Sequence, residues 1–155
     1  MLLSEVFRTE FIIVGLQADD KDEVFEEMVA HFCDVTGLET RDAILCALRE
    51  REAKMSTGIQ NGIAIPHGKS NAVDKMFGVL GVSKKGIDYD SLDGNPVHLV
   101  MMLIAPPIEA EQHLNLLQRM ANFLRNPQFY TDVVNAKSAG EISAILNKYE
   151  DAEAD

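Results

Sequence analysis

Two long apolar runs in the second half of the chain constrain its fold more than any other feature of the sequence. Residues 76–83 read MFGVLGVS, and residues 96–105 read PVHLVMMLIA. Apolar runs of this length, bounded by turn residues, predict buried strands. The segment that joins them is rich in Gly, Asp and Ser and is short enough for the two strands to run antiparallel. Buried strands of this kind need other elements packed on both faces.

The rest of the chain predicts one further strand and the helices that cover the sheet. The strand is the apolar run FIIVGL, residues 11–16. The spacing of apolar residues predicts helices at about 21–34, from Thr40 onward, across 109–126 and from Ser138 onward. The expected caps are Asp19 or Asp20 for the first helix, Thr40 for the second, and a capping box of Ser138 and Glu141 for the last, while Gly37 ends the first.

Strands and helices therefore alternate along the chain, which predicts an α/β fold. We expect a single domain over residues 1–150, built on a mixed parallel and antiparallel β-sheet of about five strands with helices on both faces. Residues 151–155 are expected to form an acidic C-terminal tail.

The charge of the chain argues against nucleic acid as a partner. The formal net charge is −11 at pH 7, so the basic surface that binds nucleic acid backbones is not expected. Charged residues interrupt the apolar N-terminus, and the apolar run VMMLIAPPI is too short to cross a bilayer. These features predict a cytoplasmic protein without membrane insertion. Cys33 and Cys46 have no metal-ligand spacing and are interpreted as reduced core thiols.

The stretch STGIQNGIAIPHGKS, residues 56–70, carries the clearest chemical signal. GIAIP predicts a short strand, which places His67 at its carboxyl end, where open α/β sheets commonly bind ligands. Pro66 restricts the backbone just before the imidazole, and Gly68 lets another molecule approach the chain closely. The hydroxyls of Ser56 and Thr57 add donors nearby. The pattern indicates a phosphate-sized cradle beside a histidine.

Histidine suits such a site because its pKa of about 6.5 leaves a neutral, nucleophilic nitrogen at cytoplasmic pH. The alternative interpretation of His67 is a loop histidine that only hydrogen-bonds to a turn. The residues of this stretch, taken alone, leave both interpretations open.

Three segments in order resemble the fructose/mannitol-type enzyme IIA domains of the bacterial phosphoenolpyruvate-dependent phosphotransferase system, including their nitrogen-regulatory relatives. The first is residues 56–70, preceded by Arg51 and Glu52, which match an Arg-Glu pair of that family. The others are GIDYDSLDGNPVHLVMMLIAPP, residues 86–107, and EQHLNLLQRMANFLRNPQF, residues 111–129. Gln60 departs from the glycine that many relatives have at this position.

The resemblance implies an enzyme that works through a phosphohistidine. His67 would accept a phosphoryl group from the phosphocarrier protein HPr, or an HPr-like protein, and pass it to a cysteine of an enzyme IIB. His113 would offer an N–H to the phosphoryl oxygens, and Arg51 would orient or neutralise the group, with Arg49 as the other candidate for that role. Ser56, Thr57 and Gly68 are the expected phosphate-binding residues. No cofactor or metal is implied.

Two alternatives remain beside sugar transport. A pair of histidines in one pocket is also found in zinc sites, but the sequence shows no third and fourth ligand. The second alternative is a purely regulatory module of the nitrogen-related branch, whose phosphorylation state changes its affinity for a protein target without any transporter partner. His31 and His98 match no histidine of the family and are interpreted as structural.

Overall fold

The computed structural model describes residues 2–154 and places the two apolar runs side by side at the centre of a β-sheet. Strands β4 (Phe77–Ile87) and β5 (Val97–Ala105) pair antiparallel, as predicted. Strand β1 (Ile12–Val14) pairs parallel with β4 on one side. On the other side, β2 (Ile63–Ala64) and β3 (His67–Lys69) both pair parallel with β5. The predicted mixed sheet of about five strands is confirmed.

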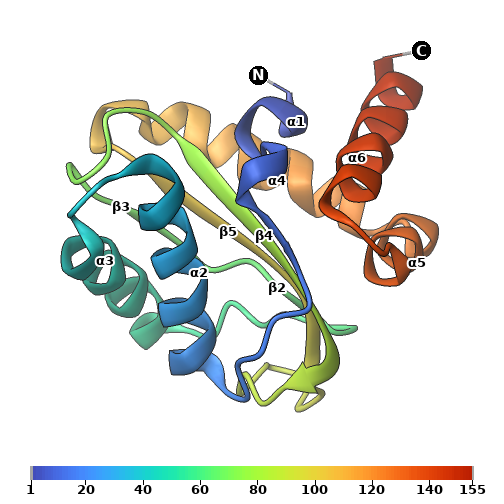
Figure 1. Ribbon diagram of the computed structural model, residues 1–155, viewed down its shortest axis with the longest axis horizontal. Coiled ribbons are helices and arrows are strands. Elements are labelled where there is room, and N and C mark those ends of the chain that lie inside the picture. Colours follow the sequence, from blue (N-terminus) through green and yellow to red (C-terminus); the bar gives the residue numbers. More distant parts are fainter. Residues whose placement is uncertain (1, 155) are drawn as a thin grey trace.

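Alternate residues of β5 face opposite sides of the sheet and are buried on both. Leu99, Met101 and Leu103 pack into one apolar core, and Val100, Met102 and Ile104 pack into the other. Helices α2 and α3 cover the second core, and α1, α4, α5 and α6 cover the first (Figure 1). The helix bounds are α1 Leu3–Val6, α2 Lys21–Thr36, α3 Arg41–Lys54, α4 Ala110–Leu124, α5 Pro127–Asn135 and α6 Ala139–Ala154, with single 3₁₀ turns η1 at Thr9–Phe11 and η2 at Pro107–Glu109. The prediction of helices on both faces is confirmed.

Several helix ends follow the predicted capping residues. The Asp20 carboxylate accepts a hydrogen bond from the backbone N–H of Glu23 at 2.9 Å, and Gly37 ends α2 with a positive φ of 77°. Ser138 caps α6 by accepting from the backbone N–H of Glu141 at 3.1 Å. Thr40 occupies the predicted N-cap position of α3, but its side chain makes no capping hydrogen bond, because the hydroxyl donates instead to the carbonyl of Ala72.

Other elements differ from the expectation. Helices α1 and α5 were not predicted, and residues 151–154 continue helix α6 where a tail was expected; residues 1 and 155 lie outside the described part of the chain. Cys33 is half-buried, but Cys46 is exposed, so the prediction of a core thiol is wrong for Cys46. Within residues 2–154, no helix has both the length and the apolar character that crossing a membrane requires.

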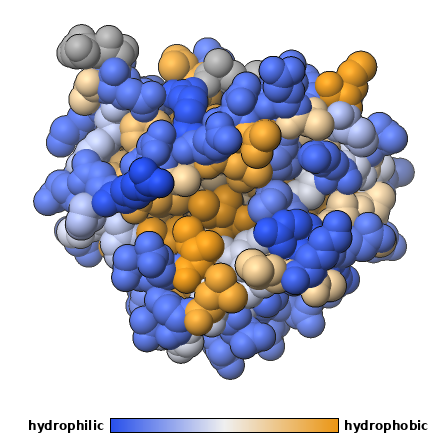
Figure 2. Space-filling model, turned by 180° about the vertical axis from the view of Figure 1, so that it is seen from behind, coloured by the Kyte–Doolittle hydropathy of each residue, from blue (hydrophilic) through white to orange (hydrophobic). Residues whose placement is uncertain are grey.

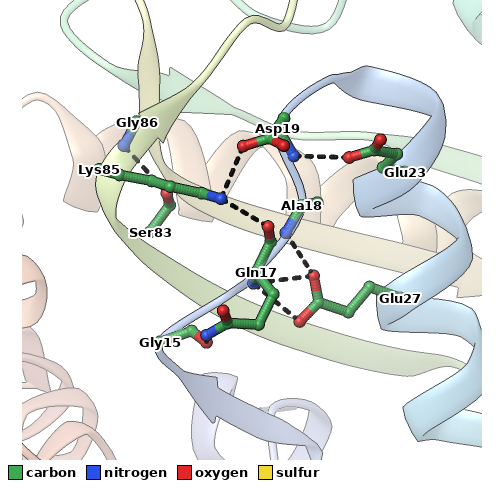
Figure 3. Close-up of polar contacts among 9 residues, drawn as sticks. All are labelled: Gly15, Gln17, Ala18, Asp19, Glu23, Glu27, Ser83, Lys85 and Gly86. Carbon is green, nitrogen blue, oxygen red and sulfur yellow. Dashed lines mark hydrogen bonds and ion pairs between the residues drawn. The ribbon is translucent and has the colours of Figure 1, made fainter.

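A group of polar contacts fixes the start of α2 against the sheet (Figure 3). The Glu27 carboxylate accepts hydrogen bonds from the backbone N–H groups of Gln17 and the residue after it. Lys85 reaches across from β4, donates to the Gln17 carbonyl at 2.7 Å and pairs with Asp19 at 2.6 Å. These contacts hold the first turn of α2, which carries Lys21, in a defined position relative to β4.

Candidate active site

His67 lies on an interrupted edge of the sheet. The predicted strand at GIAIP divides at Pro66, so that His67 opens β3 and does not follow the end of a single strand. The division has a simple cause: proline has no N–H to donate to β5, although its carbonyl still accepts from the backbone N–H of Leu103 at 2.9 Å. The interruption leaves the imidazole half-buried at the sheet edge opposite Leu103.

Hydrogen bonds define the tautomer of His67. Its Nδ1 lies 2.8 Å from the carbonyl oxygen of Ile65, which only accepts, so Nδ1 carries the ring hydrogen. Nε2 is then unprotonated and accepts a hydrogen bond from Nε of Arg51 at 3.2 Å. Burial lowers the pKa of His67, the bond to Ile65 opposes this shift, and the charge of Arg51 adds to it. The neutral ring therefore offers a lone pair on Nε2 at neutral pH.

His113 faces this ring from helix α4. The two ring centroids are 5.6 Å apart, with an angle of 62° between the planes. The His113 side chain is 2% exposed, and neither ring nitrogen has a hydrogen-bond partner among residues 2–154. Burial, followed by the charges of His67 and Lys69, lowers the pKa of His113 to about 4. A buried N–H without a hydrogen-bond partner lowers the stability of the folded protein. The ring N–H of His113 can therefore donate to a group that enters the site.

A cavity of about 670 Å³ opens beside the two rings. Three cations, on Arg51, Lys54 and Lys69, line it, although the chain as a whole has a net charge of −11. Its full lining is Ala47, Glu50, Arg51, Ala53, Lys54, His67, Gly68, Lys69 and His113. The concentration of positive charge and free donors suits an anionic group bound next to Nε2 of His67.

The structure brings together most of the predicted site residues. His67, His113, Arg51 and Gly68 line the cavity, and Arg49 points away to pair with Asp22 at 3.6 Å. Gly68 also permits close packing of β3 on α3, because a Cβ there would meet the backbone of Ala47 at 3.0 Å.

Ser56 and Thr57 are not among the residues that line the cavity. The Ser56 hydroxyl accepts from the backbone N–H of Gly58, and the buried Thr57 hydroxyl donates to Glu52. Their direct contact with phosphate stays a prediction, and the geometry gives Thr57 a different set of partners.

Sequence reasoning missed Lys54 and the buried partners of Thr57. Lys54 follows Arg51 at helical i+3 spacing, so a helical projection of the end of α3 would have found it. Tyr89 and Lys21, which surround Thr57 and Glu52, come from distant segments and give no local signal.

The remaining histidines have structural contacts, as predicted. His31 lies 2.8 Å from the carbonyl oxygen of Glu10, and His98 lies 2.9 Å from that of Ser83. Among residues 2–154, no group of three or more His, Cys, Asp and Glu side chains is placed to hold a metal ion.

Comparisons with known proteins identify the family of the chain. A family model described as "Phosphoenolpyruvate-dependent sugar phosphotransferase system, EIIA 2" matches residues 5–149. The fructose-specific EIIABC component of Bacillus subtilis is 35% identical over 150 residues, which are 97% of this chain but only 24% of that longer protein. The nitrogen regulatory protein of Bradyrhizobium diazoefficiens is 32% identical over 94% of this chain and 95% of its own length.

Solved structures share the fold. The nitrogen regulatory protein IIA-Ntr of Neisseria meningitidis superposes with a TM-score of 0.83 at 27% identity, covering 93% of this chain and 98% of that one. The enzyme IIA in the Escherichia coli complex of enzyme IIAMtl with phosphorylated enzyme IIBMtl has a TM-score of 0.73 at 21% identity, covering 90% of this chain and 95% of that one. Because the family model spans nearly the whole chain and two relatives above 30% identity cover it almost completely, the chain belongs to the EIIA 2 family of the phosphoenolpyruvate-dependent sugar phosphotransferase system.

Proposed function

We propose that this chain is a cytoplasmic phosphoryl carrier that holds the phosphoryl group on Nε2 of His67. The phosphoryl donor is HPr or an HPr-like phosphocarrier. In sugar transport the acceptor is a cysteine of an enzyme IIB, whereas in a regulatory role the phosphoryl group is not passed on to an enzyme IIB. One observation carries the proposal: an unprotonated Nε2 faces Arg51 in a cation-lined cavity, beside a buried His113 whose ring nitrogens have no partner among the described residues.

The transfer step needs no proton movement on His67. The Nε2 lone pair attacks phosphorus while the bond from phosphorus to the donor's histidine nitrogen breaks, and that nitrogen keeps the electron pair. Nδ1 keeps its hydrogen, since the Ile65 carbonyl holds it throughout. In the second step a thiolate sulfur of enzyme IIB attacks phosphorus, and the electron pair of the P–N bond returns to Nε2.

Fixed donors stabilise the charge that spreads over the phosphoryl oxygens. Arg51 must release Nε2 and turn its N–H groups to these oxygens, and its second nitrogen Nη1 stays anchored on the Met55 carbonyl at 2.9 Å. The N–H of neutral His113 supplies a further donor from the opposite wall. A donor of this kind in a dry site contributes about 3 kcal/mol to the transition state.

An apolar surface borders the site and suits a protein partner. Met55, which follows Lys54 in the chain, is 59% exposed, and Leu114, which follows His113, is 55% exposed, so two large apolar side chains are adjacent in sequence to residues that line the cavity. The face that carries α4 shows apolar side chains gathered in a shallow hollow (Figure 2), and a neighbouring groove is lined by Ile59 and Leu124. Donor and acceptor must both reach His67 across this face, so they bind in turn and form no ternary complex.

A labelling experiment tests the proposal. Incubation with labelled phosphoenolpyruvate, enzyme I and HPr is expected to add one acid-labile, base-stable phosphoryl group. His67→Ala is expected to abolish labelling, whereas the matched control His31→Ala, a histidine bonded only to the Glu10 carbonyl, is expected to keep it. Full labelling of the His67→Ala protein would refute the assignment.

A regulatory purpose is the second candidate, because nitrogen regulatory proteins are among the relatives that match this chain over nearly its whole length. Phosphorylation adds up to two negative charges at the cavity, enough to change the affinity of a protein that docks there. The two purposes are separated by the fate of the label: transfer to an enzyme IIB cysteine supports sugar transport, and a target bound by only one phosphorylation state supports regulation.

A further inference from the structure

A buried polar network lies behind the active site and does not contact the cavity. Its members are Glu52 at the end of α3, Thr57 in the following loop and Tyr89 between β4 and β5, which are 9%, 3% and 0% exposed. Buried polar groups are retained only where they are hydrogen-bonded, and a bonded buried network fixes the geometry of the segments that it joins.

The direction of each hydrogen bond can be assigned. Glu52 Oε1 accepts from the backbone N–H of Thr57 at 2.8 Å, and Glu52 Oε2 accepts from the Thr57 hydroxyl at 2.7 Å. Because that hydroxyl has a single hydrogen, the Tyr89 hydroxyl, 2.7 Å away, must be the donor in its contact with Thr57. Burial, with the charge of Glu52 adding to it, raises the pKa of Tyr89, so its hydroxyl keeps this hydrogen.

Lys21 completes the network from α2. Its ammonium lies 3.1 Å from Glu52 Oε1 and 5.0 Å from the centre of the Tyr89 ring. The contacts around Glu27 and Lys85 that fix the start of α2 (Figure 3) therefore also fix the position of this cation. The carboxylate of Glu52 thus joins α2, α3 and the loop that leads to the active site.

One backbone hydrogen bond and one bond to the His67 side chain connect this network to His67. The carbonyl of Thr57 accepts from the backbone N–H of Ile65 at 3.0 Å. The carbonyl of the same Ile65 holds Nδ1 of His67 at 2.8 Å. The position of Thr57, which Glu52 sets, therefore sets the acceptor that decides which ring nitrogen of His67 carries the hydrogen.

We infer that Glu52 is a positioning residue for phosphoryl transfer: through Thr57 and Ile65 it holds His67 in the tautomer whose Nε2 is free to attack phosphorus. The catalytic consequence rests on the proposed function, but the control of the tautomer does not. Glu52 also fixes the last turn of α3, from which the adjacent Arg51 reaches Nε2. A single carboxylate behind the site in this way orders both the nucleophile and its cationic partner.

The test measures the His67 tautomer directly, by ¹⁵N–¹H correlation of the ring nitrogens in the full chain above the pKa of His67. In wild type we expect the Nδ1–H form to predominate. In Glu52→Gln and Thr57→Val the Nε2–H fraction is expected to rise about tenfold, because each variant weakens the contacts that position the Ile65 carbonyl. Thr57→Ser keeps the hydroxyl and is expected to restore the wild-type tautomer. Asp42→Asn, an exposed change on the same helix, is the charge-matched control.

Transfer kinetics provide the second readout. The maximal rate of phosphorylation by HPr is expected to fall on the order of tenfold in Glu52→Gln and Thr57→Val, with KM for HPr unchanged, since the docking surface is intact. If Glu52→Gln fails to fold, the inference is tested by comparing the His67 tautomer and the transfer rate of Thr57→Val with those of Thr57→Ser. Variants that melt earlier but keep the wild-type tautomer would overturn the inference. A wild-type protein that HPr does not phosphorylate would refute the proposed function and leave the tautomer comparison valid.

Discussion

At the scale of single residues, the site depends on two imidazole rings that are both held neutral. His113 is unprotonated at neutral pH, because burial and the charges of the neighbouring His67 and Lys69 lower its pKa from the ordinary 6.5 to about 4. Between pH 6.5 and about pH 4 the unfolded chain binds a proton at His113 and the folded chain does not. Protonation of the unfolded chain therefore lowers the free energy of unfolding as the pH falls through this range. We expect the fall to be smaller in His113→Phe, measured by urea unfolding at pH 7 and pH 4.5.

The same residue can be followed by NMR. The ring protons of His113 are expected to keep their neutral-state shifts between pH 8 and pH 5, and to move only near pH 4. A His113 signal that titrates above pH 6 would show that the ring is solvated or paired with an anion, and would contradict its role as a neutral N–H donor.

At the scale of elements, the site depends on how closely β3 approaches α3. Gly68 allows this approach, because a Cβ at this position would lie 3.0 Å from the backbone carbonyl carbon and oxygen of Ala47. Gly68→Ala is therefore expected to lower the free energy of unfolding by about 1–3 kcal/mol and to move Arg51 away from His67. The matched control is Gly140→Ala, in helix α6, where the nearest atom to the new Cβ is at 3.8 Å; it is expected to be neutral or stabilising by up to about 1 kcal/mol. Equal unfolding midpoints for the two variants in urea would contradict the packing argument.

The elements also show what the sequence predicts and what it leaves open. Two continuous apolar runs and the short segment between them predicted the antiparallel β4–β5 pair, and the burial of such strands on both sides predicted the two covered faces. Helix α5 was not predicted, because a proline ordinarily ends a helix and Pro127 follows directly on the helix predicted across 109–126. The preceding Asn126 caps the new helix by accepting from the backbone N–H of Gln128 at 3.0 Å, and proline fits the first helical position.

The candidate site also contains residues that the sequence indicated and residues that only the structure shows. His67 and Gly68 are neighbours in the chain, whereas Arg51 and His113 were expected at the site only through the family resemblance and reach it from α3 and α4. The role of Glu52 depends on Lys21 and Tyr89, which only the folded sheet and the start of α2 bring together. Residue spacing contains no information on such contacts, so the sequence indicated the residues that line the cavity and missed the buried residues that support them.

At the scale of the whole molecule, an acidic chain presents a local apolar and cationic face around His67. Leu114, 55% exposed and adjacent to His113 on α4, lies on this face, whereas Val35, 42% exposed, lies at the end of α2 on the opposite side of the sheet. Leu114→Asp is expected to raise KM for HPr about tenfold without changing the melting temperature, because a charge there must be desolvated on docking. Val35→Asp is expected to leave KM unchanged. Equal effects of the two substitutions would argue against docking on the α4 face.

The most direct test of the account identifies the nitrogen that carries phosphorus. Protein labelled with ¹⁵N at histidine would be phosphorylated through HPr and examined by ³¹P–¹⁵N NMR. The account predicts phosphorus bound to Nε2 of His67, with Nδ1 still carrying its hydrogen towards the Ile65 carbonyl. Phosphorus on Nδ1 of His67, or on either nitrogen of His113, would contradict it.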